Sequence, residues 1–103
     1  MKIKDILSED DIIAGLHTSS KPEALQELSD LIAQNYSLKA DEVTLTLMER
    51  EKLGSTGIGN GVAIPHGKMN SLNRIVTCFG RSIKGIDFDS QDGRLTHLFF
   101  VLL

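Results

Sequence analysis

The sequence predicts a small, single-domain α/β protein. Its 103 residues suit one domain with one hydrophobic core. Two segments with helical periodicity, residues 21–35 and 38–52, precede apolar segments with the character of strands, among them residues 75–83 and 96–103. A hydrophobic content of 41% and a charged content of 24% are ordinary for a soluble globular chain.

Composition excludes several classes of function. Lysine and arginine number 11 against 14 aspartates and glutamates, so no basic excess favours a nucleic-acid ligand. The single cysteine, Cys78, rules out an intramolecular disulfide and argues against a thiolate zinc site. The segment "MKIKDILSEDD" turns acidic before any apolar run develops, so no signal peptide is expected. The longest apolar run, residues 98–103, is too short to span a bilayer, which predicts a cytoplasmic chain that is not membrane-embedded.

The N-terminal third contains one short turn and one clear helix. Ser8 is a candidate cap for a helical turn, and "IIAGL" is a candidate short strand. Ser20 and Glu23 form an S-x-x-E capping box, and Pro22 suits the first turn of a helix over residues 21–35. One stripe of this helix is apolar and predicts a core-packing face: Ala24, Leu25, Leu28, Leu31 and Ile32.

The second helix, residues 38–52, has Ser37 as a plausible N-cap and Gly54 as a natural stop. Its expected buried stripe consists of Ala40, Val43 and Leu47. At about 100° per residue, Arg50 falls on the same stripe. The side chains expected to point elsewhere are Glu49, Glu51 and Lys52.

The remaining segments predict strands. "VAIPH" is a short strand ended by Pro65, and residues 75–83 form another. The segment from "KGIDF" to "DGRLT" forms a hairpin or a long turn, with Asp92-Gly93 in the turn. Residues 96–103, "THLFFVLL", have the continuous apolar character of a fully buried strand. Such a strand needs partners on both edges and cover on both faces. We therefore expect that the sequence is a fragment, or that another chain supplies the cover.

The stretch "GSTGIGNGVAIPHGK", residues 54–68, is rich in glycine just ahead of His66. A dinucleotide fingerprint and a P-loop are both excluded by spacing and context. Two interpretations stay equally weighted on the loop alone: a tight turn without a ligand, or an anion cradle. In the second, hydroxyls and backbone N–H groups are the donors, and the phosphate-binding candidates are Ser55, Thr56, Gly57, Gly59 and Asn60.

Arg50 and His66 favour the cradle. A guanidinium keeps its charge, so Arg50 needs an anionic partner or must reach solvent. The alternative is an ordinary salt bridge to a carboxylate. His66 lies between Pro65 and Gly67, and a histidine side chain can offer a neutral ring nitrogen as nucleophile or base. No second histidine, cysteine or carboxylate lies at a metal-ligand spacing, so no metal site is expected.

The segment "MEREKLGSTGIGNGVAIPHGK", residues 48–68, closely resembles the active-site region of enzyme IIA domains of the fructose/mannitol class in the bacterial phosphotransferase system. It is most similar to the nitrogen-regulatory branch, and the flanking helices and the last strand extend the likeness over nearly the whole chain. The resemblance implies one α/β domain over residues 1–103, with a mixed sheet flanked by helices. It also implies a helical segment after the last strand that bears a second active-site histidine.

The same resemblance implies the chemistry. His66 is the phosphorylated histidine, and Arg50 steadies the phosphoryl group. The donor is an HPr-like phosphocarrier protein, the acceptor is a IIB component or a regulatory target, and neither metal nor organic cofactor is required. The alternative function is a regulatory binding module whose docking is gated by phosphorylation of His66 without onward transfer. A third hypothesis is an anion-binding domain without any transfer.

Overall fold

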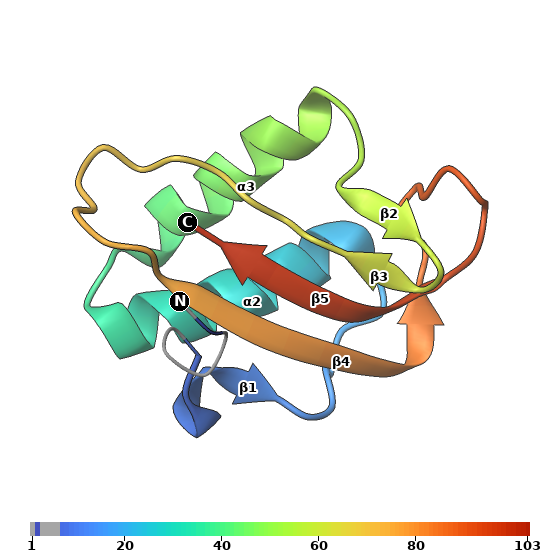
Figure 1. Cartoon of the computed structure of the whole chain (residues 1–103), viewed down its shortest axis with the longest axis horizontal. Coiled ribbons are helices and arrows are strands. Elements are labelled where there is room, and N and C mark those ends of the chain that lie inside the picture. The colour runs from blue at the N-terminus through green and yellow to red at the C-terminus, as the bar shows by residue number, and fades with distance from the viewer. Residues whose placement is uncertain (1, 3–6) are drawn as a thin grey trace.

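The computed structural model describes residue 2 and residues 7–103. Its elements in chain order are η1 (Glu9–Asp11), β1 (Ile12–Ile13), α2 (Lys21–Tyr36), α3 (Ala40–Lys52), β2 (Gly57–Gly59), β3 (Val62–Ala63), β4 (Thr77–Ile86) and β5 (Thr96–Leu102) (Figure 1). The part of the signal-peptide argument that concerns residues 1 and 3–6 lies outside the described residues. No described helix is both long and apolar enough to cross a membrane.

The strands form one mixed sheet in the order β1-β4-β5-β3-β2. The outer strand β1 runs parallel to β4, and β3 runs parallel to β5. The two other pairs, β4 with β5 and β2 with β3, are antiparallel. The two longest strands, β4 and β5, lie side by side, and each is paired on both of its edges (Figure 1). The predicted α/β domain with a mixed sheet is confirmed.

The first helix follows its sequence signals closely. Ser20 caps α2, since its hydroxyl accepts a hydrogen bond from the N–H of Glu23 at 3.3 Å, and Pro22 lies in the first turn. The prediction that Ser37 caps α3 is wrong. It ends α2 in the left-handed region at φ 56°, where its N–H donates to the carbonyl of Ala33. The N-cap of α3 is Lys39, without a side-chain cap bond.

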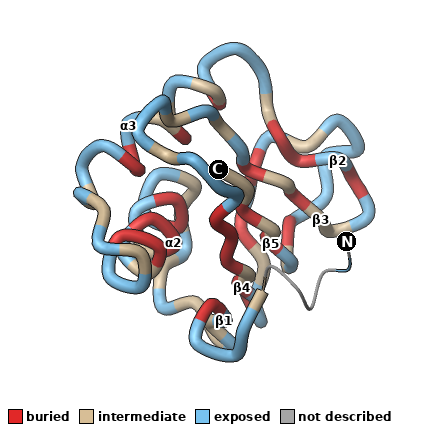
Figure 2. The backbone as a smooth tube through the Cα atoms, turned by 60° about the vertical axis from the view of Figure 1, so that its left-hand side comes forward, coloured by how far each residue is buried: buried red, intermediate tan, exposed pale blue. Residues whose placement is uncertain are grey.

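Both helices cover the same face of the sheet, and the core lies between the two layers (Figure 2). Leu25 and Leu28 of α2 and Leu47 of α3 meet Phe99 and Val101 of β5 in this core. The remaining members of the cluster are Ala24, Ile32, Val43, Ala63, Val76, Cys78, Ile86 and Phe88. The predicted apolar stripe of α2 is thereby confirmed, with Leu31 packed at the edge of the core. In α3, Val43 and Leu47 are buried as predicted, but Ala40, the first residue of the helix, lies outside the core cluster.

The last strand differs from its prediction on one face. Both edges of β5 are paired, as expected, and Phe99 and Val101 are fully buried against the helices. Phe100 lies on the opposite face, where it meets Phe79 of β4 edge to face at 6.5 Å. On that face Leu98 is 37% exposed. The strand therefore alternates between buried and partly exposed positions.

The segment from β4 to β5 forms the long turn that was one of its two predicted forms, and Asp92-Gly93 lies within it. β4 continues through a bulge to Ile86, and the connection to β5 spans residues 87–95. Within this connection Gly93 adopts φ 70°, and its N–H donates to the carbonyl of Ser90 at 3.0 Å. This connection runs beside the glycine-rich segment, which brings it into contact with the candidate site described next.

Candidate functional site

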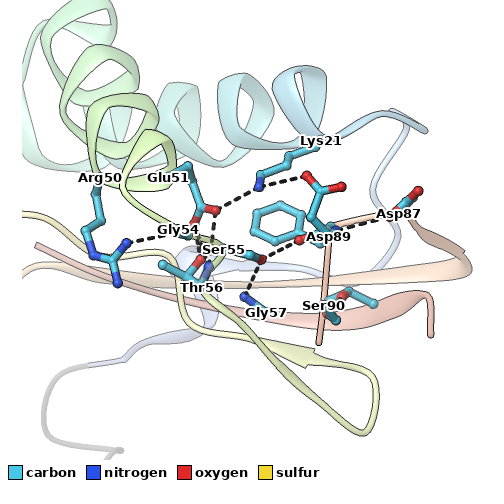
Figure 3. A network of polar contacts seen from close by, with 12 residues as sticks. Lys21, Arg50, Glu51, Gly54, Ser55, Thr56, Gly57, Asp87, Asp89 and Ser90 are labelled. Atoms are coloured by element: carbon cyan, nitrogen blue, oxygen red, sulfur yellow. Dashed lines mark hydrogen bonds and ion pairs between the residues drawn. The ribbon is translucent and has the colours of Figure 1, made fainter. Parts of the chain in front are cut away.

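Arg50 lies in the last turn of α3 and is half-exposed, although the helical period placed it on the buried stripe. Its Nη1 donates to the carbonyl of Gly54 at 2.8 Å, just beyond the helix end (Figure 3). A cation is favourable there because the last carbonyls of a helix carry partial negative charge. None of the ion pairs among the described residues involves Arg50. The guanidinium thus retains capacity to bind an anion.

His66 is held in place by its backbone, while its ring is exposed. It pairs with Leu102 in an isolated parallel bridge next to β3. The N–H of Leu102 donates to the carbonyl of Pro65 at 3.0 Å, and the N–H of Gly67 donates to the carbonyl of Leu102 at 3.1 Å. The predicted strand "VAIPH" is therefore regular only at Val62–Ala63, but its end remains attached to β5.

The ring of His66 contacts a different group on each nitrogen. Nδ1 lies 2.9 Å from the carbonyl oxygen of Ile64. Because a carbonyl only accepts, Nδ1 carries the hydrogen in this contact. Arg50 Nε donates to Nε2 at 3.3 Å. In the neutral ring, Nε2 is therefore the nitrogen with the lone pair, and it is the one that faces Arg50.

Gly67 allows the chain after His66 to pass close to α3. A Cβ at this position would lie 2.6 Å from Cγ2 of Thr46 on α3, closer than real contacts allow. The chain after His66 thus passes directly against the helix that carries Arg50. Glycine is required here for close packing and not for a special backbone angle.

The glycine-rich segment forms a β-hairpin, which the sequence analysis did not predict. β2 and β3 pair with Gly59 opposite Val62, so the turn consists of Asn60 and Gly61. Both residues have positive φ, 56° and 79°, as a type I′ turn requires. Asn-Gly between two strands is the usual sequence of such a turn, so the signal was present in the sequence.

The predicted phosphate-binding donors bond to other groups of the protein. The Ser55 hydroxyl donates to the carbonyl of Phe88 at 2.5 Å and accepts from the N–H of Gly57 at 3.0 Å. The N–H of Asn60 donates to the Asp92 carboxylate at 2.9 Å. This bond, with one from the N–H of Arg94, lowers the pKa of Asp92.

Thr56 donates to the Glu51 carboxylate. Gly59, at the end of β2, lies next to the Asp92 carboxylate of the connection between β4 and β5. The structure thus brings together Arg50 and His66, whereas the donors of Ser55, Thr56 and Asn60 are directed elsewhere. The phosphate-binding role of these loop residues stays a prediction.

Glu51 is buried, contrary to the prediction from the helical period. It was expected to point away from the core, but its side chain is only 5% exposed. It forms an ion pair with Lys21 Nζ at 2.9 Å and accepts hydrogen bonds from the N–H and the hydroxyl of Thr56 (Figure 3). A carboxylate in the last turn of a helix is unfavourable beside the helix dipole, and this was a signal that Glu51 required a specific partner.

Residues 5–103 match the family described as "Phosphoenolpyruvate-dependent sugar phosphotransferase system, EIIA 2". The chain belongs to this family. The resemblance predicted from residues 48–68 is therefore confirmed over almost the whole sequence.

Three relatives illustrate the range of this EIIA family. A nitrogen regulatory protein of Bradyrhizobium diazoefficiens is 43% identical, with 100% of this chain and 67% of the relative covered. The crystal structure of the nitrogen regulatory protein IIA-Ntr of Neisseria meningitidis matches with a TM-score of 0.92 and 38% identity, covering 98% of this chain and 69% of that one. A fructose-specific EIIABC component of Bacillus subtilis is 33% identical, covering 99% of this chain and 16% of the relative. The chain spans about two thirds of the length of the nitrogen regulatory proteins that it matches.

Other reactive side chains of this EIIA chain are engaged elsewhere. His17 contacts the Glu27 carboxylate at 3.2 Å, and His97 Nδ1 lies 3.0 Å from the carbonyl of Ser82. Cys78 is fully buried in the core, as predicted, and this burial raises the pKa of its thiol to about 12. The described part of the chain contains no cluster of three or more histidine, cysteine, aspartate or glutamate residues that could hold a metal ion.

Proposed function

We propose that this chain is a phosphoryl carrier of the phosphotransferase system and that His66 accepts the phosphoryl group on Nε2. The contact between Arg50 Nε and His66 Nε2, 3.3 Å long, is the observation that carries the proposal. It places a permanent cation beside the one ring nitrogen that has a free lone pair. The exposure of His66 supports the proposal, since the phosphoryl group of another protein can reach an exposed ring.

The proposed transfer makes use of this geometry. The Nε2 lone pair of neutral His66 attacks the phosphorus of the donor's phosphohistidine, and the electron pair of the breaking P–N bond returns to the donor's ring nitrogen. Nδ1–H remains bonded to the carbonyl of Ile64 throughout. Phosphoryl transfer passes through a loose transition state, so positioning and stabilisation of charge determine the rate.

Arg50 has two roles in this scheme. Before transfer, its Nε–H donates to Nε2 and holds the ring in a single orientation. During transfer the guanidinium turns from the nitrogen to the phosphoryl oxygens, whose negative charge it balances. Its second hydrogen bond, to the carbonyl of Gly54, keeps the side chain at the end of α3.

The donor in this proposal is an HPr-like phosphocarrier, and the reaction takes place in the cytoplasm. The nitrogen-regulatory relatives favour a signalling role in which the phosphorylation state of His66 controls docking to a partner protein. Onward transfer to a IIB component is the alternative, supported by the fructose-specific relative. Leu53, which is 85% exposed three residues after Arg50, offers apolar surface beside the site for either partner.

The proposal is tested by supplying this chain with a phosphorylated HPr-like donor and measuring the label. We expect an acid-labile, base-stable phosphate in the wild type and in His17→Gln, and none in His66→Gln. His17 is a suitable control because its side chain is 91% exposed and lies in another part of the fold. A label that persists in His66→Gln contradicts the assignment.

The regulatory and the transfer roles are separated by partner binding. In the regulatory role, His66→Ala and His66→Glu differ in their affinity for the target protein. In the transfer role, a purified IIB component removes the label from phosphorylated wild type. If neither substitution changes the affinity for the target protein, the regulatory role is contradicted. If no IIB component removes the label, the transfer role is contradicted.

A further inference from the structure

A buried ion pair lies beside the proposed phosphoryl site and takes no part in the transfer itself. Glu51 follows Arg50 on α3, and its carboxylate lies between the first turn of α2 and the segment after α3 (Figure 3). Lys21 Nζ lies 2.9 Å from its Oε2, and the two side chains are 18% and 5% exposed. A buried carboxylate needs a cation and hydrogen-bond donors to stay ionised, and Lys21 supplies the cation.

Thr56 supplies the donors. Its backbone N–H lies 3.2 Å from Glu51 Oε2, and its hydroxyl donates to Oε1 of the same carboxylate. Thr56 itself is 4% exposed. Because one carboxylate binds both the backbone and the side chain of Thr56, this residue is fixed in position and in rotamer.

Thr56 continues the connection toward the proposed nucleophile. Its carbonyl accepts the N–H of Ile64 at 3.0 Å, and the carbonyl of Ile64 accepts the Nδ1–H of His66 at 2.9 Å. Two residues, Thr56 and Ile64, thus connect Glu51 to the imidazole through hydrogen bonds. The path thus begins on α3 at Glu51 and ends at His66, whose Nε2 contacts Nε of the preceding helix residue, Arg50.

The same loop is attached on its other side. The Ser55 hydroxyl donates to the carbonyl of Phe88, and Lys21 Nζ lies 4.7 Å from the centre of the Phe88 ring. Lys21 Nζ also lies 3.3 Å from Asp89 Oδ2. The segment between α3 and β2 is therefore held between the helix end and the connection that precedes β5.

We propose that Glu51 is the positioning residue that sets the orientation of the His66 ring relative to Arg50, acting through Thr56 and Ile64, with Lys21 as its counter-ion. This inference rests on the proposed phosphoryl transfer. Glu51 moves neither a proton nor the phosphoryl group. It holds the carbonyl of Ile64 where it accepts from Nδ1, so that the lone pair of the neutral ring stays on Nε2, beside the guanidinium.

The test uses two variants that conserve volume. Glu51→Gln keeps the shape but loses the charge and one acceptor, and Thr56→Val loses the hydroxyl but keeps the backbone N–H and carbonyl. Glu49→Gln is the matched control, since Glu49 is exposed on the same helix. Two readouts are needed: the rate of phosphoryl acceptance, and the tautomer of His66 from the ¹⁵N chemical shifts of the neutral ring.

We expect the wild type and Glu49→Gln to hold His66 mainly as the Nδ1–H tautomer. In Glu51→Gln and Thr56→Val we expect a mixture of tautomers and a rate lower by about tenfold to a hundredfold, as misplaced reacting groups produce. The proposal is overturned if both folded variants match the control in tautomer and rate. If Glu51→Gln does not fold, Thr56→Val decides alone, because it leaves the ion pair intact.

The tautomer readout also separates this inference from the proposed function. It is measured on the unphosphorylated protein, so it tests the path from Glu51 to His66 even if no donor phosphorylates the wild type. Absence of phosphorylation in the wild type contradicts the proposed function. An unchanged tautomer in both variants contradicts the positioning role alone.

Discussion

Arg50 and Glu51 are neighbours in the last turn of α3, yet their environments are opposite. Arg50 is half-exposed, and its partners are a backbone carbonyl and one ring nitrogen. Glu51 is buried, and its carboxylate is satisfied by Lys21 and Thr56. Consecutive residues of a helix point about 100° apart, so one turn presents two different faces.

Because their environments differ, the two neighbours serve different purposes: Arg50 can bind an anion, and Glu51 orders the surrounding protein. The charge of Arg50 is available to an anion because no carboxylate of the described residues neutralises it. The charge of Glu51 is fully used within the protein, where it orders the segment that leads to His66. A site for transfer between proteins requires an accessible reactive group that is held by neighbouring residues whose own hydrogen bonds and charges are satisfied.

The largest expected effect is the loss of the guanidinium. Arg50→Met should lower the rate of phosphoryl acceptance by about 10²- to 10³-fold, because the charge of the transferring group is no longer balanced. The free energy of unfolding should change by less than about 1 kcal/mol, since the side chain is half-exposed. Stopped-flow transfer assays and urea unfolding measure the two quantities. A rate within twofold of the wild type would remove Arg50 from the mechanism.

The opposite pattern is expected for its neighbour. Glu51→Ala should lower the free energy of unfolding by about 2–4 kcal/mol, because Lys21 loses its buried partner and both donors of Thr56 lose their acceptor. Glu49→Ala, on the exposed face of the same helix, should stay within about 0.5 kcal/mol of the wild type. Urea unfolding of the three proteins checks this, and equal stability of the two variants would contradict the account.

A smaller effect is expected where the chain passes against α3. Gly67→Ala should destabilise the fold by about 1–3 kcal/mol, because the new Cβ overlaps Cγ2 of Thr46. Thr46→Ser removes that methyl group and keeps the hydroxyl that donates to the carbonyl of Glu42. The double variant should therefore recover most of the lost melting temperature. A double variant no more stable than Gly67→Ala would show that the close approach is not the cause.

The smallest effect concerns a buried carboxylate remote in sequence from the proposed site. Burial raises the pKa of Asp11, but hydrogen bonds from Ser8, Asn35 and Tyr36 outweigh it and hold this pKa below 3.8. A lowered folded pKa stabilises the protein above the unfolded value, and this contribution is lost as the pH falls through the folded value. Asp11→Asn should thus cost about 1 kcal/mol at pH 7 and almost nothing in acid.

Unfolding measured between pH 7 and pH 2.5 checks this prediction, together with phosphoryl acceptance at pH 7. The transfer rate should not change, since Asp11 lies outside the path from Glu51 to His66. A stability difference that grows in acid would reverse the expected sign.

The sequence predicted the parts of the fold that local rules determine. The cap at Ser20, the proline in the first turn and the apolar stripe placed α2 almost to the residue. Ser37 was assigned to the wrong helix, because the two helices are joined by a very short connection and a polar residue there suits either end. The hairpin turn at Asn60 and Gly61 was not predicted, although the dipeptide indicates it, because so many glycines also suit a tight turn or an anion cradle.

The sequence predicted the reactive pair of the site but not its support. Arg50 and His66 were selected from residue chemistry and from the family resemblance, and the structure places them in contact. Glu51 was dismissed because a helical wheel represents one helix and cannot include Lys21, which approaches from another. The helical segment that the resemblance implies after residue 103 stays a prediction.

The nitrogen that carries the phosphoryl group tests the central claim most directly. ¹⁵N-labelled protein, phosphorylated by an HPr-like donor, shows by its ¹⁵N–³¹P coupling and chemical shifts which ring nitrogen is bonded to phosphorus. The account predicts phosphate on Nε2 of His66, with the hydrogen retained on Nδ1. Phosphate on Nδ1, on another residue, or on none while an established EIIA protein is labelled by the same donor would contradict it.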